Sequence, residues 1–113
     1  MDKVVVWAIE LKELNKVIGW IELCEASKEA FKYSKEIGFT LAEEHWGQGL
    51  MPEAIQVVLN YVFNEEEIDV IVCSHFIYNS QSEKAIKKCG FEFYLEADNE
   101  KFYCLTKDAN LEY

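Results

Sequence analysis

The chain has 113 residues, 50% of them hydrophobic and 14% aromatic, which is typical of a single folded domain over residues 1–113. Its formal net charge is −10 and all eleven basic residues are lysines, so the chain repels phosphate backbones and nucleic-acid binding is disfavoured. No apolar run approaches the roughly 20 residues of a membrane span, and the first residues lack a secretory signal, so we expect a cytoplasmic protein.

The cysteines are few and widely spaced, without a Cys-x-x-Cys pair, and the histidines do not cluster. Metal ligation and a disulfide framework are therefore both disfavoured, and we expect four buried, reduced thiols. The cysteines are Cys24, Cys73, Cys89 and Cys104.

The first 42 residues predict three strands. Residues 4–11 and 16–24 are apolar and rich in β-branched side chains, with a turn at 12–15 between them. After a polar stretch, residues 31–42 form a third extended segment. Because the connections are short, the three strands should form an antiparallel meander.

The hydrophobic period changes after this meander. Residues 52–64 carry apolar side chains at helical spacing, whereas residues 68–73 form a short apolar run, as in a strand covered on both faces. The strands at 31–42 and 68–73 should therefore lie parallel, joined by a right-handed crossover. The helical positions are Ala54, Ile55, Val58, Leu59 and Val62.

A second helix has clear signals at both ends. Ser80 and Glu83 predict a capping box at its start, and Gly90 should end it. Strands at 91–95 and 102–106 follow, joined by an acidic loop at 96–100. The order βββαβαββ predicts an α+β fold, a mixed sheet with a helix on either face.

The turn between the third strand and the first helix is rich in glycine. Gly47 and Gly49 can adopt backbone angles that are closed to other residues, and Pro52 suits the first helical position. The free amides at a helix start favour a phosphate or pyrophosphate there. A sharp strand-to-helix connection would also need glycine without any ligand, so the turn alone leaves both interpretations open.

Two motifs resemble the GCN5-related N-acetyltransferases (GNAT), especially the branch that acetylates ribosomal-protein N-termini, polyamines and similar amines. The first is Ile37-Gly-Phe-Thr-Leu followed by His45-Trp-Gly-Gln-Gly-Leu-Met-Pro-Glu-Ala. The second is Asn79-x-x-Ser82-x-x-x-Ile86-x-x-x-Gly90-Phe91. Two motifs in the correct order, one strand apart, are more specific than either alone.

The resemblance implies acetyl-CoA as co-substrate, held where the parallel strands splay. The third strand would hold the pantetheine arm, the glycine turn the pyrophosphate, and Asn79 a pantetheine amide. Ser82 would lie near the thiol, as the catalytic donor, and Lys84 or Lys87 would reach a phosphate. The implied cofactor-binding residues are Phe39, Thr40, Leu41, Trp46, Gly47, Gln48, Gly49, Leu50, Asn79, Ser82 and Lys87.

Several of these residues also fit purely structural roles. Asn79 and Ser82 suit the start of any helix, Lys87 suits any last turn, and a tryptophan such as Trp46 more often packs as an anchor. His45 and His75 are candidate bases, although a lone histidine is more often structural. The candidate acidic bases are Glu22, Glu43 and Glu100, and nothing in the sequence ranks them.

The chain also departs from the family pattern. Glu44 stands where the family usually has Gln or Arg, and Ile86 stands where many members carry a tyrosine acid. The family's first strand and its two following helices have no counterpart before residue 4. That shortening should leave apolar surface uncovered, which predicts a homodimer.

The leading hypothesis is an acetyl-CoA-dependent N-acetyltransferase that acts on a primary amine, such as a protein N-terminus, a polyamine or a small amine. The alternative is a non-catalytic acetyl-CoA-binding or interaction module with the same fold. The short N-terminus, Ile86 and Glu44 favour the alternative, whereas the two motifs fit both hypotheses.

Overall fold

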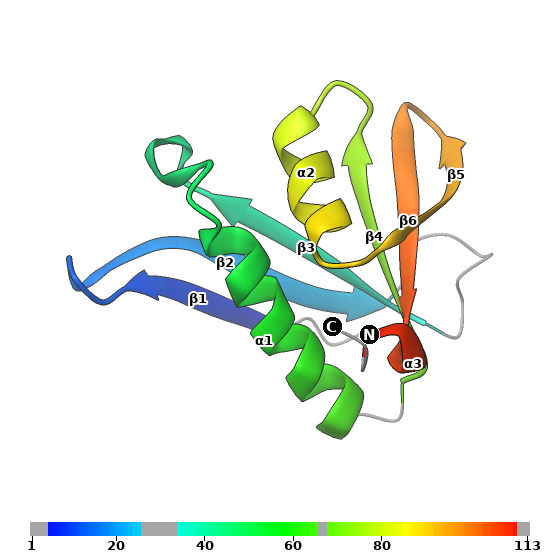
Figure 1. Ribbon diagram of the computed structural model, residues 1–113, viewed down its shortest axis with the longest axis horizontal. Coiled ribbons are helices and arrows are strands. Elements are labelled where there is room, and N and C mark those ends of the chain that lie inside the picture. Colours follow the sequence, from blue (N-terminus) through cyan, green and yellow to red (C-terminus); the bar gives the residue numbers. More distant parts are fainter. Residues whose placement is uncertain (1–4, 26–33, 66–67, 111–113) are drawn as a thin grey trace.

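The computed structural model describes residues 5–25, 34–65 and 68–110, and its strands form one mixed sheet in the order β1-β2-β3-β4-β6-β5 (Figure 1). The predicted order βββαβαββ is confirmed, and a short helix, which the sequence did not predict, follows it. The strands are β1 (Val5–Leu11), β2 (Lys16–Glu25), β3 (Lys35–Leu41), β4 (Val70–Phe76), β5 (Glu92–Ala97) and β6 (Glu100–Thr106). The helices are the 3-10 turn η2 (Glu43–His45), α1 (Leu50–Glu65), α2 (Ser80–Lys88) and α3 (Lys107–Asn110).

The sheet combines an antiparallel meander with a parallel junction. Strands β1, β2 and β3 pair antiparallel, as predicted. Strands β3 and β4 pair parallel over only three residue pairs, the last being Ile37 with Cys73. Beyond that pair the two strands diverge (Figure 1). Among the described strands, none pairs with the second half of β3 on the side away from β2, at the place where this half of the strand faces α2.

The prediction of a helix on either face is wrong, because α1, α2 and α3 all pack into one core on the same face. Strands β3, β4 and β5 are parallel to one another, and the chain steps the same way across the sheet from each to the next. Two right-handed crossovers that step in the same direction place both of their helices on the same face. The shared core includes Ile21, Ile37, Ile55, Leu59, Ile71, Ile86 and Tyr103.

The opposite face carries a smaller buried cluster of Val72 and Phe102. Several of its other apolar side chains are exposed, among them Trp20 at 44% and Phe76 at 49%. Within the described ranges, no helix covers this open face.

The hairpin between β5 and β6 is tighter than predicted. The sequence predicted an acidic loop over 96–100, but Glu96 and Glu100 lie in the strands. Asp98 and Asn99 alone make the turn, with φ of 54° and 66°. Asparagine and aspartate tolerate this left-handed conformation, which a two-residue hairpin turn of type I′ requires at both positions.

The four cysteines are free, but only Cys73 and Cys89 are buried, whereas Cys24 and Cys104 are half-buried. Burial raises the pKa of Cys89 to about 11, so this thiol stays neutral near pH 7. In the part of the chain that the structure describes, none of the helices has the length and apolar character needed to cross a membrane.

Candidate functional site

A cavity of about 290 Å³ lies where the end of β3, the start of α1 and one face of α2 meet. It brings together most of the residues that the resemblance implied, namely Phe39, Thr40, Leu41, Trp46, Gly47, Gly49, Leu50, Asn79 and Ser82. Gln48 and Lys87 do not line it. Met51, Gln81 and Lys88 line it although the sequence analysis did not assign them to the site.

The glycine turn has the backbone that the sequence predicted. Gly47 and Gly49 both have φ of 76°, a conformation that strains residues with a Cβ atom. Helix α1 then begins at Leu50, two residues earlier than predicted, because the Gly49 carbonyl already accepts a hydrogen bond from the Glu53 N–H at 3.3 Å. Pro52 is thus in the first turn, where its missing N–H still costs nothing.

Trp46 anchors this turn to the sheet. Its indole Nε1–H donates a hydrogen bond to the Leu41 carbonyl at 2.8 Å, across five residues of chain. The side chain is 43% exposed and also lines the cavity. The indole therefore ties the turn to the end of β3 and also forms part of the cavity wall.

Glu44 is held away from the glycine turn's cavity. Its Oε1 lies 3.9 Å from both Lys16 Nζ and His45 Nε2, and its side chain is 67% exposed. Glu44 and His45 do not line the cavity. The Glu44 carboxylate thus lies outside the cavity, beside Lys16.

Asn79, rather than Ser80, is the N-cap of α2. Its Oδ1 accepts a hydrogen bond from the Ser82 N–H at 3.2 Å. The predicted capping box is wrong, because the Glu83 carboxylate instead contacts Lys87, Lys101 and His75 at 3.8–3.9 Å. Capping uses the oxygen of the Asn79 amide, and no hydrogen bond among the described residues uses its nitrogen.

The lysines of α2 divide between two environments. Lys84 and Lys88 line the cavity, whereas Lys87 Nζ lies 3.9 Å from Glu83 Oε1 outside it. A Cβ atom built on Gly49 would lie 4.0 Å from Lys88 Nζ, so this ammonium sits over the glycine turn. The signal that could have found Lys88 is the spacing of Gln81, Lys84 and Lys88, which share one helical face.

Two of the three candidate acidic bases lie at the divergence of β3 and β4. A Cβ atom built on Gly38 would lie 3.1 Å from Glu22 Oε1, and Glu100 Oε1 accepts a hydrogen bond from the Ser74 hydroxyl at 3.2 Å. Gly38 and Ser74 are the first residues beyond the last parallel pair. Both carboxylates belong to the open face, since Glu22 and Ser74 alternate with the core residues of their strands. Glu43 lies in η2, away from this divergence.

Ile86 and Ser82 have opposite surroundings on α2. Ile86 is fully buried in the core. Its side chain is aliphatic, so it has no proton to donate to a leaving thiolate. Ser82 lines the cavity, and its hydroxyl makes no hydrogen bond with another described residue. The only hydroxyl that α2 offers to the cavity wall, among the described lining residues, is therefore that of Ser82.

Residues 1–92 match the family described as the acetyltransferase (GNAT) domain. The chain is 33% identical over 89 residues to the uncharacterized N-acetyltransferase YoaA of Bacillus subtilis, a match covering 76% of this chain and 48% of YoaA. The chain thus spans about half the length of this curated relative.

Solved structures share the fold at low sequence identity. The ribosomal-protein-S5-alanine acetyltransferase of Vibrio fischeri matches at a TM-score of 0.77 and 20% identity, over 93% of this chain and 62% of that one. The aminoglycoside acetyltransferase AAC(6')-Ib, solved in complex with coenzyme A, matches at a TM-score of 0.79 and 20% identity, over 96% of this chain and 69% of that one.

Proposed function

The chain belongs to the acetyltransferase (GNAT) family, and on that basis we propose that its cavity binds acetyl-CoA and that the protein transfers the acetyl group to a primary amine. The observation that carries the proposal is the meeting of three features on one cavity. These are the diverging end of β3, the left-handed glycine turn before α1, and the α2 face that bears Asn79, Ser82 and Lys88.

Each feature fits one part of acetyl-CoA. The edge of β3 that faces away from β2, over Phe39, Thr40 and Leu41, would hold the pantetheine arm as an added strand does. The N–H groups of the first turn of α1, together with the Lys88 ammonium, would hold the pyrophosphate. The free amide nitrogen of Asn79 would bond a pantetheine carbonyl.

The reaction asks three things of the protein. An amine attacks only when it is neutral, so a base must take its proton, and Glu22 and Glu100 lie at the divergence on the open face. A backbone N–H of β3 would orient the thioester carbonyl that acetyl-CoA supplies. As the new N–C bond forms and the C–S bond breaks, the Ser82 hydroxyl would donate a hydrogen bond to the leaving thiolate, which takes its proton from solvent.

These roles place the two reactants on opposite sides of the sheet. Acetyl-CoA would enter from the helix-covered face, and the acceptor would approach from the open face. The acceptor is a protein N-terminus, a polyamine or a small amine. The free cysteines suit the reducing cytoplasm, where we place the protein.

Thermal unfolding with and without acetyl-CoA tests the proposal. A ligand that binds only the folded state stabilises it by about 2.7 kcal/mol at a concentration 100 times its dissociation constant, so saturating acetyl-CoA should raise Tm by several degrees. Gly49→Glu should abolish this shift, because it puts a carboxylate and a strained φ into the turn. An unchanged Tm for the wild type would refute cofactor binding.

The second candidate function is an acetyl-CoA-binding module without turnover, and the buried Ile86 favours it because no tyrosine stands there. Incubation with acetyl-CoA and a panel of amines, with released thiol measured, separates the two functions. CoA release with any one amine would refute the non-catalytic module. Binding without release across the panel would refute the enzyme.

A further inference from the structure

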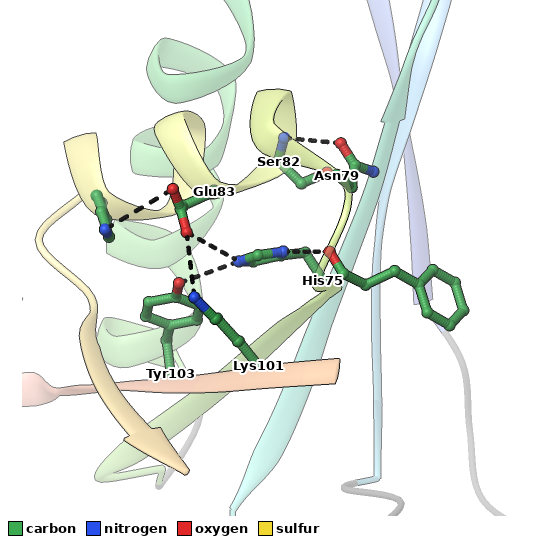
Figure 2. Close-up of polar contacts among 8 residues, drawn as sticks. His75, Asn79, Ser82, Glu83, Lys101 and Tyr103 are labelled. Carbon is green, nitrogen blue, oxygen red and sulfur yellow. Dashed lines mark hydrogen bonds and ion pairs between the residues drawn. The ribbon is translucent and has the colours of Figure 1, made fainter. Parts of the chain in front are cut away.

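His75, a candidate base in the sequence analysis, lies outside the cavity and is buried beneath α2, with its ring only 1% exposed. Figure 2 shows the ring between Glu83 on α2 and Tyr103 on β6. Its Nδ1 lies 2.6 Å from the Phe76 carbonyl oxygen, and its Nε2 lies 3.0 Å from the Tyr103 hydroxyl. Both ring nitrogens therefore have polar partners, as buried polar groups in folded proteins generally do.

The Phe76 carbonyl connects His75 to the cavity. The same oxygen accepts a second hydrogen bond, at 2.9 Å, from the backbone N–H of Asn79. A carbonyl has two lone pairs, so it can hold the imidazole and the Asn79 backbone at once. Asn79 in turn caps α2 through Ser82, and both residues line the cavity.

We propose that His75 is a positioning residue for the cofactor site, whose Nδ1–H orients the Phe76 carbonyl and through it fixes Asn79 and the first turn of α2. The inference rests on the proposed function, because Asn79 and Ser82 are assigned to acetyl-CoA there. His75 touches neither the cavity nor the proposed reacting atoms.

Tyr103 holds the imidazole in the tautomer that this role requires. A carbonyl cannot donate, so a hydrogen must be on Nδ1, and in the neutral imidazole Nε2 then accepts from the Tyr103 hydroxyl. Burial, reinforced by the Glu83 carboxylate, raises the pKa of Tyr103, so the phenol keeps the proton it donates. The two rings also stack, with centroids 5.4 Å apart and an interplanar angle of 25°, which limits rotation of the imidazole.

Two substitutions separate the ring nitrogens. In His75→Asn the side-chain amide nitrogen takes the place of Nδ1, so the hydrogen bond to the Phe76 carbonyl is kept. In His75→Gln the amide nitrogen takes the place of Nε2, so that hydrogen bond is lost. Val72→Ala, in the buried cluster of the open face, is a matched control for general destabilisation. Acetyl-CoA affinity by calorimetric titration and hydrogen exchange of the Asn79 amide are measured for each variant, well below its Tm.

We expect His75→Gln to bind acetyl-CoA roughly tenfold more weakly, with faster exchange at Asn79, since one buried hydrogen bond is lost. His75→Asn should stay within about threefold of the wild type, and Val72→Ala should bind unchanged. Equal affinity and equal Asn79 exchange in the Asn and Gln variants would overturn the inference. So would an equal loss of affinity in Val72→Ala.

The proposed function and the positioning role of His75 can be refuted independently of each other. If the wild type does not bind acetyl-CoA, the proposed function is wrong, and Asn79 exchange alone then decides whether His75 positions this residue. If His75→Gln does not fold, Tyr103→Phe replaces it, because this change removes only the hydroxyl that sets the tautomer. Unchanged exchange at Asn79 in Tyr103→Phe would then overturn the inference.

Discussion

At the residue scale, Asn79 divides two roles between the two ends of one amide. Its oxygen caps α2, and its nitrogen makes no hydrogen bond among the described residues, which under our proposal makes it available to acetyl-CoA. Asn79→Asp keeps the cap but loses the donor, so we expect unchanged stability and acetyl-CoA binding weaker by about tenfold. Asn79→Ala should lose both and cost about 1 kcal/mol of unfolding free energy.

Urea unfolding and calorimetric titration of the two Asn79 variants check this separation. If Asn79→Asp and Asn79→Ala lower the free energy of unfolding equally, the helix cap is not what Asn79 contributes to stability. If Asn79→Asp binds acetyl-CoA as tightly as the wild type does, the amide nitrogen of Asn79 does not contact the ligand.

Adjacent lysines of α2 offer a second test at this scale. Lys88 lies over the glycine turn, whereas Lys87 pairs with Glu83 outside the cavity. We expect Lys88→Gln to weaken acetyl-CoA binding about tenfold and to reduce its dependence on salt, because a charge-assisted contact is lost. Lys87→Gln makes the same change in net charge and should bind normally. Equal effects of the two variants, in titrations at low and high salt, would show that only the total charge matters.

At the element scale, Gly19 lets β2 and β3 approach closely at the cavity wall. A Cβ atom built there would clash with the Thr40 carbonyl oxygen, which is backbone and cannot rotate away. Gly19→Ala should therefore push the end of β3 outward, cost about 1–3 kcal/mol of stability and weaken acetyl-CoA binding.

Gly38→Ala is the control for stability in this comparison. Its added methyl group would meet the Glu22 carboxylate at 3.1 Å, and that flexible side chain can move. Urea unfolding should thus show a smaller loss for Gly38→Ala than for Gly19→Ala. The reverse order would mean that the approach of β3 to β2 is not as tight as the structure shows.

At the scale of the whole molecule, we propose that the β1–β2 part of the open face pairs two copies of the chain, which leaves the divergence of β3 and β4 accessible to the acceptor. Val6 and Trp20 are exposed on this part of the sheet, at 57% and 44%. Light scattering should give twice the chain mass of 13.2 kDa, because covering such side chains favours association. Trp20→Glu should yield a monomer, while Val57→Glu, on the outer side of α1, should not. A monomeric wild type at high concentration would contradict the proposal.

Much of this molecule was predictable, and the corrections have a common cause. The order of strands and helices along the chain, the helical stretch over 52–64 and the conformations of Gly47 and Gly49 follow from short-range patterns. The errors concern the Asn79 cap, the turn at Asp98 and Asn99, and the faces that the helices cover. Each of these depends on how a segment meets its neighbours, which the pattern of one segment does not contain.

The sequence by itself determined the order of elements, the glycine turn and the membership of a family, because periodicity, glycine spacing and motif order are local properties. Only the tertiary structure decided that Lys88 rather than Lys87 faces the turn, that Glu44 lies outside the cavity and that His75 is buried beneath α2. The positions of Lys88 and His75 follow from the rotation of α2 and from the register of β4 against β6, and the position of Glu44 follows from the path of η2. The rotation and the register are set by packing between residues far apart in the chain.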